Sequence, residues 1–423
     1  MLQKKLLFIL SIVIVAALAL SACGQPAPTQ PPVAPEVPAA TEAPAATEAP
    51  VEPEEPFIVG MLLIGPANDA GWSQAHVEGL DYVVENVPGV EYIFLENVYT
   101  GSTSHAQTPA ELAADMVAKG AKLVVFNSDD QKDFAIKFAQ DNPDVYVIHA
   151  SGDASWEEGK NFENLPNMKN IMGEMEYGKM MAGCAAALTT QTGKIGFLGP
   201  LINDETRRFA AAAYLGAKHC WSNVRGNDPA SLEFKVNWIG FWFNIPGVTL
   251  DPTQVAADFY NTGYDVVISS IDTTEALVEA KRLAADGKQV WAIPYDYANA
   301  CAGGDDVCLG VPFFNWGPSY VKAIESIKAG TWEGNFELPG PDWANINDPD
   351  TSAIGFNKGG ALSEENVVLL DSFIQELGGG LKLWTGPLNY QDGTPFLAEG
   401  EVATLQQIWY LPQLLEGMEG KSE

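Results

Sequence analysis

Short apolar runs alternate with amphipathic stretches along most of the chain. The apolar runs are rich in Val and Ile and predict eight β-strands, at 57–64, 90–95, 123–127, 145–150, 194–198, 235–239, 266–270 and 290–294. Apolar positions with helical spacing lie between most of them, at 107–119, 133–140, 177–189, 206–220, 252–262 and 274–286. Strands that alternate with helices are typical of parallel sheets covered on both faces. We therefore expect an α/β protein.

Eight strands are many for one sheet built with helices of ordinary length. A polar break at 160–169, which contains Pro166 and several Asn residues, divides them four from four. The pattern therefore predicts two doubly wound lobes of similar build, with no sequence repeat between them. A chain of 423 residues, 47% of them hydrophobic, is long enough to form two cores.

The N-terminus has a different pattern. Lys4 and Lys5 precede an apolar run at 6–20, which suits a signal peptide and is short for a membrane-spanning helix of about 20 residues. The run ends in Leu20-Ser21-Ala22-Cys23, which resembles a bacterial lipobox. The resemblance implies removal of residues 1–22 and attachment of a lipid to Cys23, which would hold the protein on the outer face of a membrane. A plain signal anchor with an incidental cysteine is the alternative.

Residues 23–56 are mostly Pro, Ala, Thr, Glu and Val and include no aromatic residue. Such a segment cannot form a core, and its prolines favour a semi-stiff, extended tether. Four further cysteines follow it, in what the signal peptide indicates is an oxidising compartment. Cys301 and Cys308 flank a Gly/Asp loop and could form a disulfide, and Cys184 and Cys220, each in a predicted helix, could form another. Four free thiols are the alternative.

Composition and motifs exclude several classes of function. A formal net charge of −32 disfavours nucleic acid and polyphosphate as partners, because binding them usually requires a basic face. The four His and five Cys show no metal-ligand spacing. The chain has no P-loop, dinucleotide fingerprint, G-x-S-x-G or H-E-x-x-H motif. We therefore expect no metal, no cofactor and no enzymatic activity.

The predicted strand ends carry the candidate binding residues. In doubly wound sheets the ligand crevice lies beyond the carboxyl ends of the strands. Aromatic and polar side chains follow those ends in both halves: Asp69, Trp72, Asn127, Ser128, Asp129, Trp242, Asp272 and Asp296. Aromatic faces combined with hydrogen-bonding groups suit a flat polar heterocycle or a sugar ring.

Each candidate also has an ordinary structural role. Trp72 and Trp242 could pack in a core or hinge, which is the commoner fate of tryptophan. Asp272 precedes Thr273-Thr274-Glu275 and could cap the next helix, which would occupy its carboxylate. The Asn and Asp residues at 127–130 favour turns even without a ligand.

A series of short motifs, in order from about residue 57 to about residue 415, resembles the basic membrane protein family of ABC-transporter solute-binding proteins. It includes Val59-Gly60, Asp69-Ala70-Gly71-Trp72, His149-Ala150-Ser151-Gly152, Asp272-Thr273-Thr274-Glu275-Ala276 and Asn315-Trp316-Gly317-Pro318. The resemblance implies the type I periplasmic-binding-protein fold, with lobe 1 at 57–170 plus about 309–345 and lobe 2 at 171–308 plus about 346–415. It also implies a lipid-anchored protein that faces the outside or the periplasm and passes a small molecule to an ABC permease.

The resemblance also suggests a solute. Characterised family members bind purine nucleosides, and some related members bind free purine bases. Trp72 and Trp242 match the stacking positions, and Asp272 and Asp296 match polar positions of the second lobe. Where nucleoside binders place a Lys, this chain reads Phe313-Phe314-Asn315-Trp316, which weakens the expectation of ribose binding. The departure resembles binders of adenine or other nucleobases, with Trp316 as a further aromatic wall.

Three alternatives to purine transport stay open from the sequence. The first is a receptor for a different small solute, such as a sugar or a signal. The second is a surface hydrolase that uses paired acids, and the third is a structural or adhesive lipoprotein.

Overall fold

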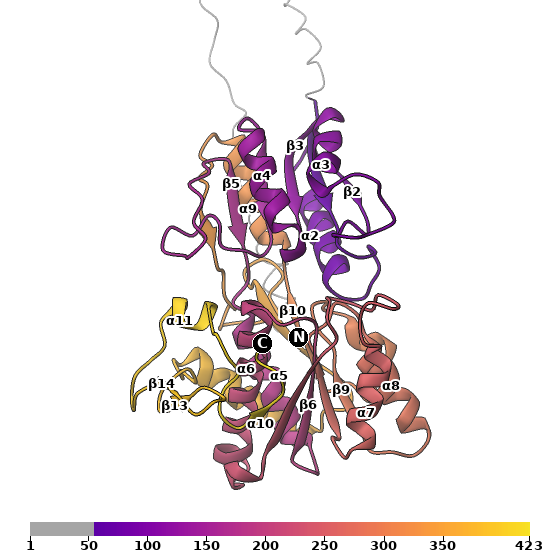
Figure 1. Cartoon of the computed structure of the whole chain (residues 1–423), viewed down its shortest axis with the longest axis vertical. Helices are drawn as coiled ribbons and strands as arrows, with labels where there is room; N and C mark the ends of the chain where they lie inside the picture. The colour runs from indigo at the N-terminus through magenta and orange to yellow at the C-terminus, as the bar shows by residue number, and fades with distance from the viewer. Residues whose placement is uncertain (1–54) are drawn as a thin grey trace, which may run out of the picture. The chain divides into compact units, whose positions relative to one another are not determined.

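The computed structural model describes residues 55–423. The predicted signal peptide, the lipidation site Cys23 and nearly all of the predicted tether lie outside the described residues. Two parallel sheets organise the described part, each flanked by helices (Figure 1). We name the two halves built on these sheets the first lobe and the second lobe.

The first lobe is built on six parallel strands in the order β11-β5-β4-β3-β1-β2. Their bounds are β1 (Phe57–Leu62), β2 (Val90–Leu95), β3 (Ala121–Phe126), β4 (Tyr146–His149), β5 (Met168–Ile171) and β11 (Phe336–Glu337). The helices of this lobe are α2 (Trp72–Asn86), α3 (Pro109–Ala118), α4 (Lys132–Asp141) and α9 (Gly317–Lys328).

The second lobe is built on five parallel strands in the order β15-β7-β6-β8-β9. Their bounds are β6 (Lys194–Gly199), β7 (Glu233–Trp238), β8 (Val266–Ser269), β9 (Trp291–Ile293) and β15 (Met418–Glu419). An antiparallel pair, β10 (Gly310–Phe314) and β12 (Ile354–Lys358), lies beside β9. The helices are α5 (Met175–Thr189), α6 (Asp204–His219), α7 (Pro252–Asn261), α8 (Glu275–Ala285), α10 (Glu364–Gly378) and α11 (Leu405–Trp409). A two-stranded hairpin, β13 (Leu388–Asn389) and β14 (Pro395–Leu397), lies near the C-terminus.

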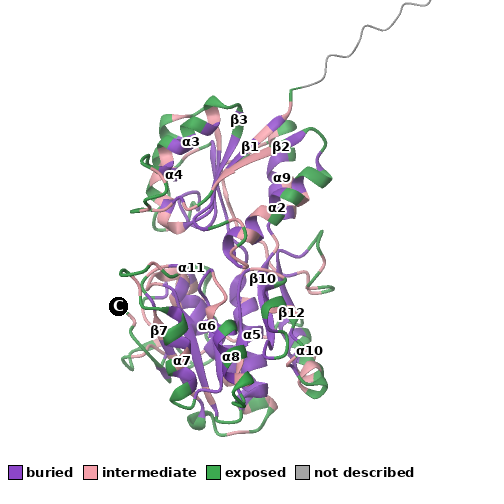
Figure 2. Ribbon diagram, turned by 90° about the vertical axis from the view of Figure 1, so that its right-hand side faces the viewer, coloured by how far each residue is buried: buried purple, intermediate pink, exposed green. Residues whose placement is uncertain are grey.

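The central strands are mostly apolar because most of their residues are buried, as Figure 2 shows for both sheets. In β3, Leu123 and Val125 pack into one core cluster, whereas Val124 and Phe126 pack into the cluster on the opposite face. In β8, Val266 and Ile268 face one cluster and Val267 faces another. This arrangement confirms the doubly wound α/β architecture that the sequence predicts.

Each of the eight predicted strands overlaps a strand of the structure, and they fall four into each sheet. The polar break expected at 160–169 is not a connection between the lobes, because β5 begins inside it and extends the first sheet. Its polar Lys169 is buried and paired with Glu337 of the neighbouring strand β11. The exact lobe boundaries stay a prediction, although β11 joins the first sheet and β15 joins the second.

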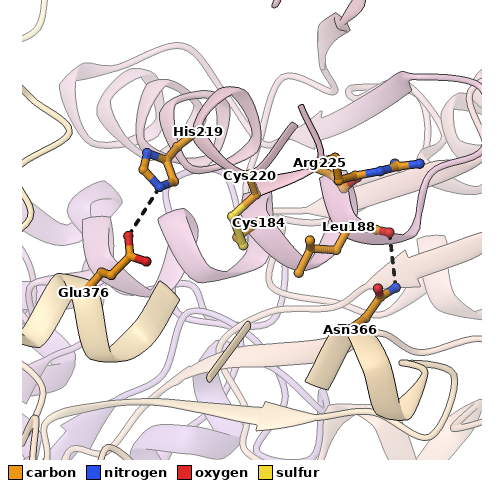
Figure 3. Close-up of a disulfide and its surroundings, with 8 residues drawn as sticks. Cys184, Leu188, His219, Cys220, Arg225, Asn366 and Glu376 are labelled. Carbon is orange, nitrogen blue, oxygen red and sulfur yellow. Dashed lines mark hydrogen bonds and ion pairs between the residues drawn. A yellow bond between two sulfur atoms is a disulfide. The ribbon is translucent and has the colours of Figure 1, made fainter. Parts of the chain in front are cut away.

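Helices α5 and α6 form the most closely packed pair of the second lobe. A Cβ at Gly183 of α5 would lie 1.9 Å from the carbonyl oxygen of Ala213, so only glycine fits there. Cys184 is joined by a disulfide to Cys220, which directly follows α6 (Figure 3). A second disulfide joins Cys301 and Cys308. Both pairs considered in the sequence are therefore bonded in the structure.

None of the helices within residues 55–423 combines the length and apolar character needed to cross a membrane.

Candidate functional site

A cavity with about 350 Å³ of unoccupied space, including its open mouth, lies between the two lobes. It sits where the carboxyl ends of strands from both sheets meet, as expected for this class of fold. The first lobe contributes Trp72, Ser128, Asp129 and Ser151. The second lobe contributes Glu205, Thr206, Phe209, Trp242, Ser270, Asp272 and Tyr295. Five of the residues expected from the sequence therefore share one cavity: Trp72, Ser128, Asp129, Trp242 and Asp272.

Trp72 forms one aromatic wall and is held in a fixed orientation. It is the first residue of α2 and is 7% exposed. Its indole N–H donates to the backbone carbonyl of Asn127. Its ring packs edge-on against Phe314 and Trp316, with ring centroids 5.3 Å apart in both pairs. These contacts leave the ring little freedom to rotate.

Trp242 forms the aromatic wall of the second lobe. It lies in the loop after β7 and is 8% exposed. Its neighbours Phe241 and Phe243 both pack on Tyr99 of the first lobe, each with centroids 5.5 Å apart. The aromatic contact between the lobes at this loop is thus made by the two Phe rings, while Trp242 lines the cavity.

Asp272 is fixed by backbone contacts and keeps its carboxylate for the cavity. Its N–H donates to the carbonyl of Trp242 at 2.9 Å, and the residue is 5% exposed. The alternative of a helix cap is wrong, because the residue at the N-cap of α8 is Thr274 and no side chain caps that helix. Burial, together with the charges of Asp296 and Asp69, raises the pKa of Asp272 well above its ordinary value.

The charged groups that line the cavity are all acidic: Asp129, Glu205 and Asp272. Burial raises the pKa of Glu205 to about 7, while Arg208 acts in the opposite direction. The hydroxyls of Ser270 and Tyr295 are buried and have no hydrogen-bond partner among the described residues. A buried polar group without a hydrogen-bond partner is energetically costly, so these two hydroxyls are available to form hydrogen bonds with a bound solute.

A buried lysine lies beneath the cavity. Lys179 of α5 is fully buried, and its ammonium group donates to the carbonyl of Ser269 at 3.1 Å. The same ammonium lies 3.1 Å from the centroid of the Tyr295 ring. Burial lowers the pKa of Lys179 well below its ordinary value, and the nearby charge of Asp296 opposes that shift. Lys179 thus orients a cavity residue through its ring without lining the cavity itself.

Four expected site residues lie behind the cavity instead of lining it. The Asp69 carboxylate accepts hydrogen bonds from the backbone N–H groups of Gly71, Ser73 and Gln74, at 2.9–3.0 Å. The side chain of Asn127 accepts from the N–H of Ile64 at 2.9 Å. Both of these residues support the loop and helix that place Trp72. Their direct contact with a solute stays a prediction.

The other two are Asp296 and Trp316. Asp296 is fully buried, with a backbone φ of +72°, and exchanges backbone hydrogen bonds with β10 on both sides of Phe313. Trp316 stacks on His76, with centroids 4.2 Å apart, and on Phe314, with centroids 5.0 Å apart. Its ring therefore backs Trp72, and solute contact by either residue stays a prediction.

Six lining residues were not singled out in the sequence: Ser151, Glu205, Thr206, Phe209, Ser270 and Tyr295. Ser151, Ser270 and Tyr295 lie within two residues of a strand end, so the rule that selected Asp272 could also have selected them. Glu205 and Phe209 are on the first two turns of α6, six and ten residues after the end of β6. Across residues 55–423, no group of three or more His, Cys, Asp or Glu side chains could hold a metal ion.

Residues 57–338 match the family model described as ABC transporter substrate-binding protein PnrA-like. This match spans well over half of the chain. The chain belongs to the PnrA-like (Bmp) family of ABC transporter substrate-binding proteins. The resemblance expected from the sequence motifs is thereby confirmed.

Two curated relatives are similar to this chain over much of its length. A purine-binding protein of Brucella abortus is 27% identical over 372 residues, which cover 87% of this chain and 94% of that protein. A putative ABC transporter glucose-binding protein of Haloferax volcanii is 28% identical over 273 residues, covering 64% of this chain and 61% of that protein.

Two solved structures share the fold. An ABC transporter solute-binding protein of Aeropyrum pernix has a TM-score of 0.58 at 17% identity, covering 78% of this chain and 83% of that one. Another, from Conexibacter woesei, has a TM-score of 0.55 at 16% identity, covering 77% and 97%. The fold is thus that of the type I periplasmic-binding proteins, as predicted.

Membership of the PnrA-like family settles the broad function. The protein binds a small molecule outside the cytoplasm and delivers it to an ABC permease, and it is not an enzyme.

Proposed function

We propose that this PnrA-like protein captures an uncharged purine, in the first place a free nucleobase, in the cavity between its lobes. The observation that carries the proposal is the lining of that cavity. Two indole rings, Trp72 and Trp242, face it from opposite lobes, together with a set of hydrogen-bond acceptors. We further propose that a lipid on Cys23 keeps the protein at the membrane, close to its permease.

The charge of the lining supports a guest that donates hydrogen bonds. Asp129, Glu205 and Asp272 can accept hydrogen bonds from ring N–H and amino groups. A phosphorylated or acidic solute would place its negative charge within a few ångströms of these carboxylates, where repulsion is strong at low dielectric. Nucleotides and organic acids are therefore disfavoured.

The shape of the lining supports a flat guest. Aromatic rings such as Trp72 and Trp242 can stack on the face of a planar heterocycle, which is worth about 1–3 kcal/mol per base in other systems. The cavity is compact, with about 350 Å³ of unoccupied space even when its open mouth is included. A single heterocycle suits such a volume better than a long or branched molecule.

The named relatives favour a purine first and a sugar second. The relative from Brucella abortus, matched over nearly its whole length, is called a purine-binding protein. The relative from Haloferax volcanii, matched over a smaller part, is called a putative glucose-binding protein. Sugar hydroxyls also donate hydrogen bonds to carboxylates, so a neutral sugar is the second candidate.

The proposed mechanism is closure of the two lobes around the solute. Contacts between the lobes already exist in this structure, such as the hydrogen bond of 3.3 Å from the Asn203 side chain to the Asp129 carboxylate. A solute that touches both walls binds the closed form more tightly and shifts the equilibrium toward it. The permease would then receive the solute from the closed form.

Native mass spectrometry of protein purified without refolding tests the proposal, because a bound purine would appear as a mass added to the protein. The sample is then titrated with adenine, hypoxanthine, adenosine and glucose. Asp272→Asn should weaken the best solute by about tenfold or more, since an amide replaces a buried carboxyl group that can accept hydrogen bonds from the solute. The matched control is Asp306→Asn, which changes an exposed acid of the same lobe. If glucose bound most tightly, the solute would be a sugar and not a purine. If none of the four compounds bound, the proposal would be overturned.

A further inference from the structure

We propose that residues 404–411, which we name the C-terminal strap, hold the two lobes together beside the cavity and detach from the first lobe when the cleft opens. The strap lies outside residues 57–338, the part of the chain that the family model matches. The inference rests on the proposed closure of the lobes but not on the identity of the solute. Figure 1 shows α11, which forms most of the strap, at the rim of the second lobe that faces the first.

Aromatic contacts anchor the strap to the first lobe. The ring of Tyr410 stacks on Trp156, with centroids 5.9 Å apart and planes within 8° of parallel. Trp409 packs edge-on against Trp156 at 5.8 Å and against Phe336 of β11 at 5.1 Å. Trp409 and Tyr410 are both buried, although Trp409 ends α11 of the second lobe and Tyr410 directly follows that helix.

Hydrogen bonds strengthen the same anchor. The Tyr410 hydroxyl donates to the carboxylate of Asp153, which is itself buried, and accepts the backbone N–H of Lys160 at 2.7 Å. The side chain of Gln406 donates to the carbonyl of Glu158. All of these partners belong to one first-lobe loop, the connection between β4 and β5.

The strap is anchored to the second lobe from Leu411 onward, directly after Tyr410. The carbonyl of Leu411 accepts a hydrogen bond of 2.7 Å from Nε of Arg207 in α6. The side chains of Leu411 and Leu414 are fully buried in the core of the second lobe, and Met418 pairs with Phe234 in its sheet. Trp409 also contacts this lobe, since the guanidinium carbon of Arg208 in α6 lies 3.9 Å from the centroid of its ring.

No flexible segment separates the two anchors. Tyr410 is held by the first lobe and Leu411 by the second, and neighbouring Cα atoms are only about 3.8 Å apart. A hinge rotation that widens the cleft must therefore break one anchor. The first-lobe anchor is the weaker one, because it consists of two rings and a few hydrogen bonds, whereas the second includes buried leucines and a paired strand.

The strap is also placed to influence the solute cavity. Trp409 and Tyr410 line a polar hollow that shares Asp129, Ser151 and Glu205 with the cavity. The strap thus covers one side of the cavity without lining it. Releasing the first-lobe anchor would open that side and let the walls move apart.

The test compares Tyr410→Phe with wild type. This substitution removes only the hydroxyl that binds Asp153 and Lys160 and keeps the stacked ring. The control is Tyr390→Phe, since Tyr390 stacks on Phe396 and its hydroxyl makes no hydrogen bond within the described residues. Dissociation of adenine is followed by stopped flow. We expect it to be about tenfold faster in Tyr410→Phe and unchanged in the control, since the closed form loses a hydrogen bond to a charged group.

Equal dissociation rates in wild type and both variants would contradict the proposal. They would mean that residues 404–411 stay in place while the cleft opens. If adenine does not bind, the proposed solute fails and the strap is tested by small-angle scattering of the unliganded protein. The radius of gyration should then be larger for Trp409→Leu than for wild type, and equal values would contradict the inference. Melting temperatures near that of the control establish that the variants are folded.

Discussion

The backbone of Gly71 in the first lobe lies directly against the backbone carbonyl of Asp272 in the second. A Cβ placed on Gly71 would be 1.9 Å from that oxygen and 2.6 Å from the carbonyl carbon. No side chain fits in that space, and the atoms in the way are backbone atoms that cannot rotate aside. This contact therefore allows the lobes to approach as closely as they do, at the edge of the cavity formed by Trp72 and Asp272.

Gly71→Ala is expected to keep the lobes apart. The added methyl group collides with Asp272 only in the closed arrangement, so the fold of each lobe should be unaffected. Affinity for the solute should fall by about tenfold or more, since the competent closed form becomes rarer. Calorimetric titration measures the affinity, and small-angle scattering of the mixture with solute should show a more extended particle than wild type.

The control for this experiment is Gly303→Ala. A Cβ at Gly303 would have its nearest neighbour at 3.9 Å, which is ordinary contact. An affinity of Gly71→Ala equal to that of Gly303→Ala would show that the contact between Gly71 and Asp272 does not limit closure.

Asp272→Asn is expected to weaken binding while stabilising the protein. Because the pKa of Asp272 is raised in the folded state, folding takes up protons, and the penalty on stability grows as pH rises from about 4 through the folded pKa. Each unit of raised pKa corresponds to about 1.4 kcal/mol. The melting temperature of Asp272→Asn should therefore exceed that of wild type at pH 7, and the difference should vanish near pH 3. An unchanged melting temperature at pH 7 would mean that the carboxylate is well solvated.

Glu205 is expected to make solute binding depend on pH near neutrality. Its pKa is raised to about 7, so part of the unliganded protein carries a proton on this carboxyl at pH 7. A solute that donates hydrogen bonds prefers the ionised carboxylate, so binding should release protons and the affinity should increase from pH 6 to pH 8. Calorimetry in buffers of different ionisation enthalpy measures the released protons. Glu205→Gln should remove this dependence, and proton uptake on binding would contradict the role of Glu205 as an acceptor.

Trp242→Leu is expected to lower affinity without unfolding the second lobe. The indole ring lines the cavity, while Phe241 and Phe243 make the aromatic contacts of the same loop. Loss of stacking on a base is worth about 1–3 kcal/mol, which corresponds to roughly five- to 150-fold in the dissociation constant. The dissociation constant and the melting temperature are measured together, and a large loss of stability would indicate a packing role instead.

The strands were predictable from the sequence because their side chains are buried on both faces. Val124 and Val125 enter different core clusters, and such burial selects the uninterrupted Val-rich runs that mark β3. Strand β5 escaped notice because it includes Lys169 and Asn170, whose polar groups are satisfied by partners distant in sequence such as Glu337. Local hydrophobicity cannot reveal such partners.

The cavity was predictable only where a residue lies in, or at the end of, the segment that follows a strand. That rule selected Trp72, Trp242 and Asp272, which do meet in one cavity. It could not separate Asp272 from Asp69, because the carboxylate of Asp69 is taken up by three backbone N–H groups of its own turn. The C-terminal strap left no local signal, since Tyr410 and its partner Asp153 are 257 residues apart.

Calorimetric titration of wild type and Trp242→Ala with adenine tests most directly whether the cavity between the lobes binds an uncharged purine. We expect a dissociation constant in the micromolar range or below for wild type, about −8 kcal/mol or more favourable. We expect the affinity to drop at least about tenfold in Trp242→Ala. Tight binding that is unchanged by the loss of Trp242, or the absence of binding to wild type, would contradict the claim.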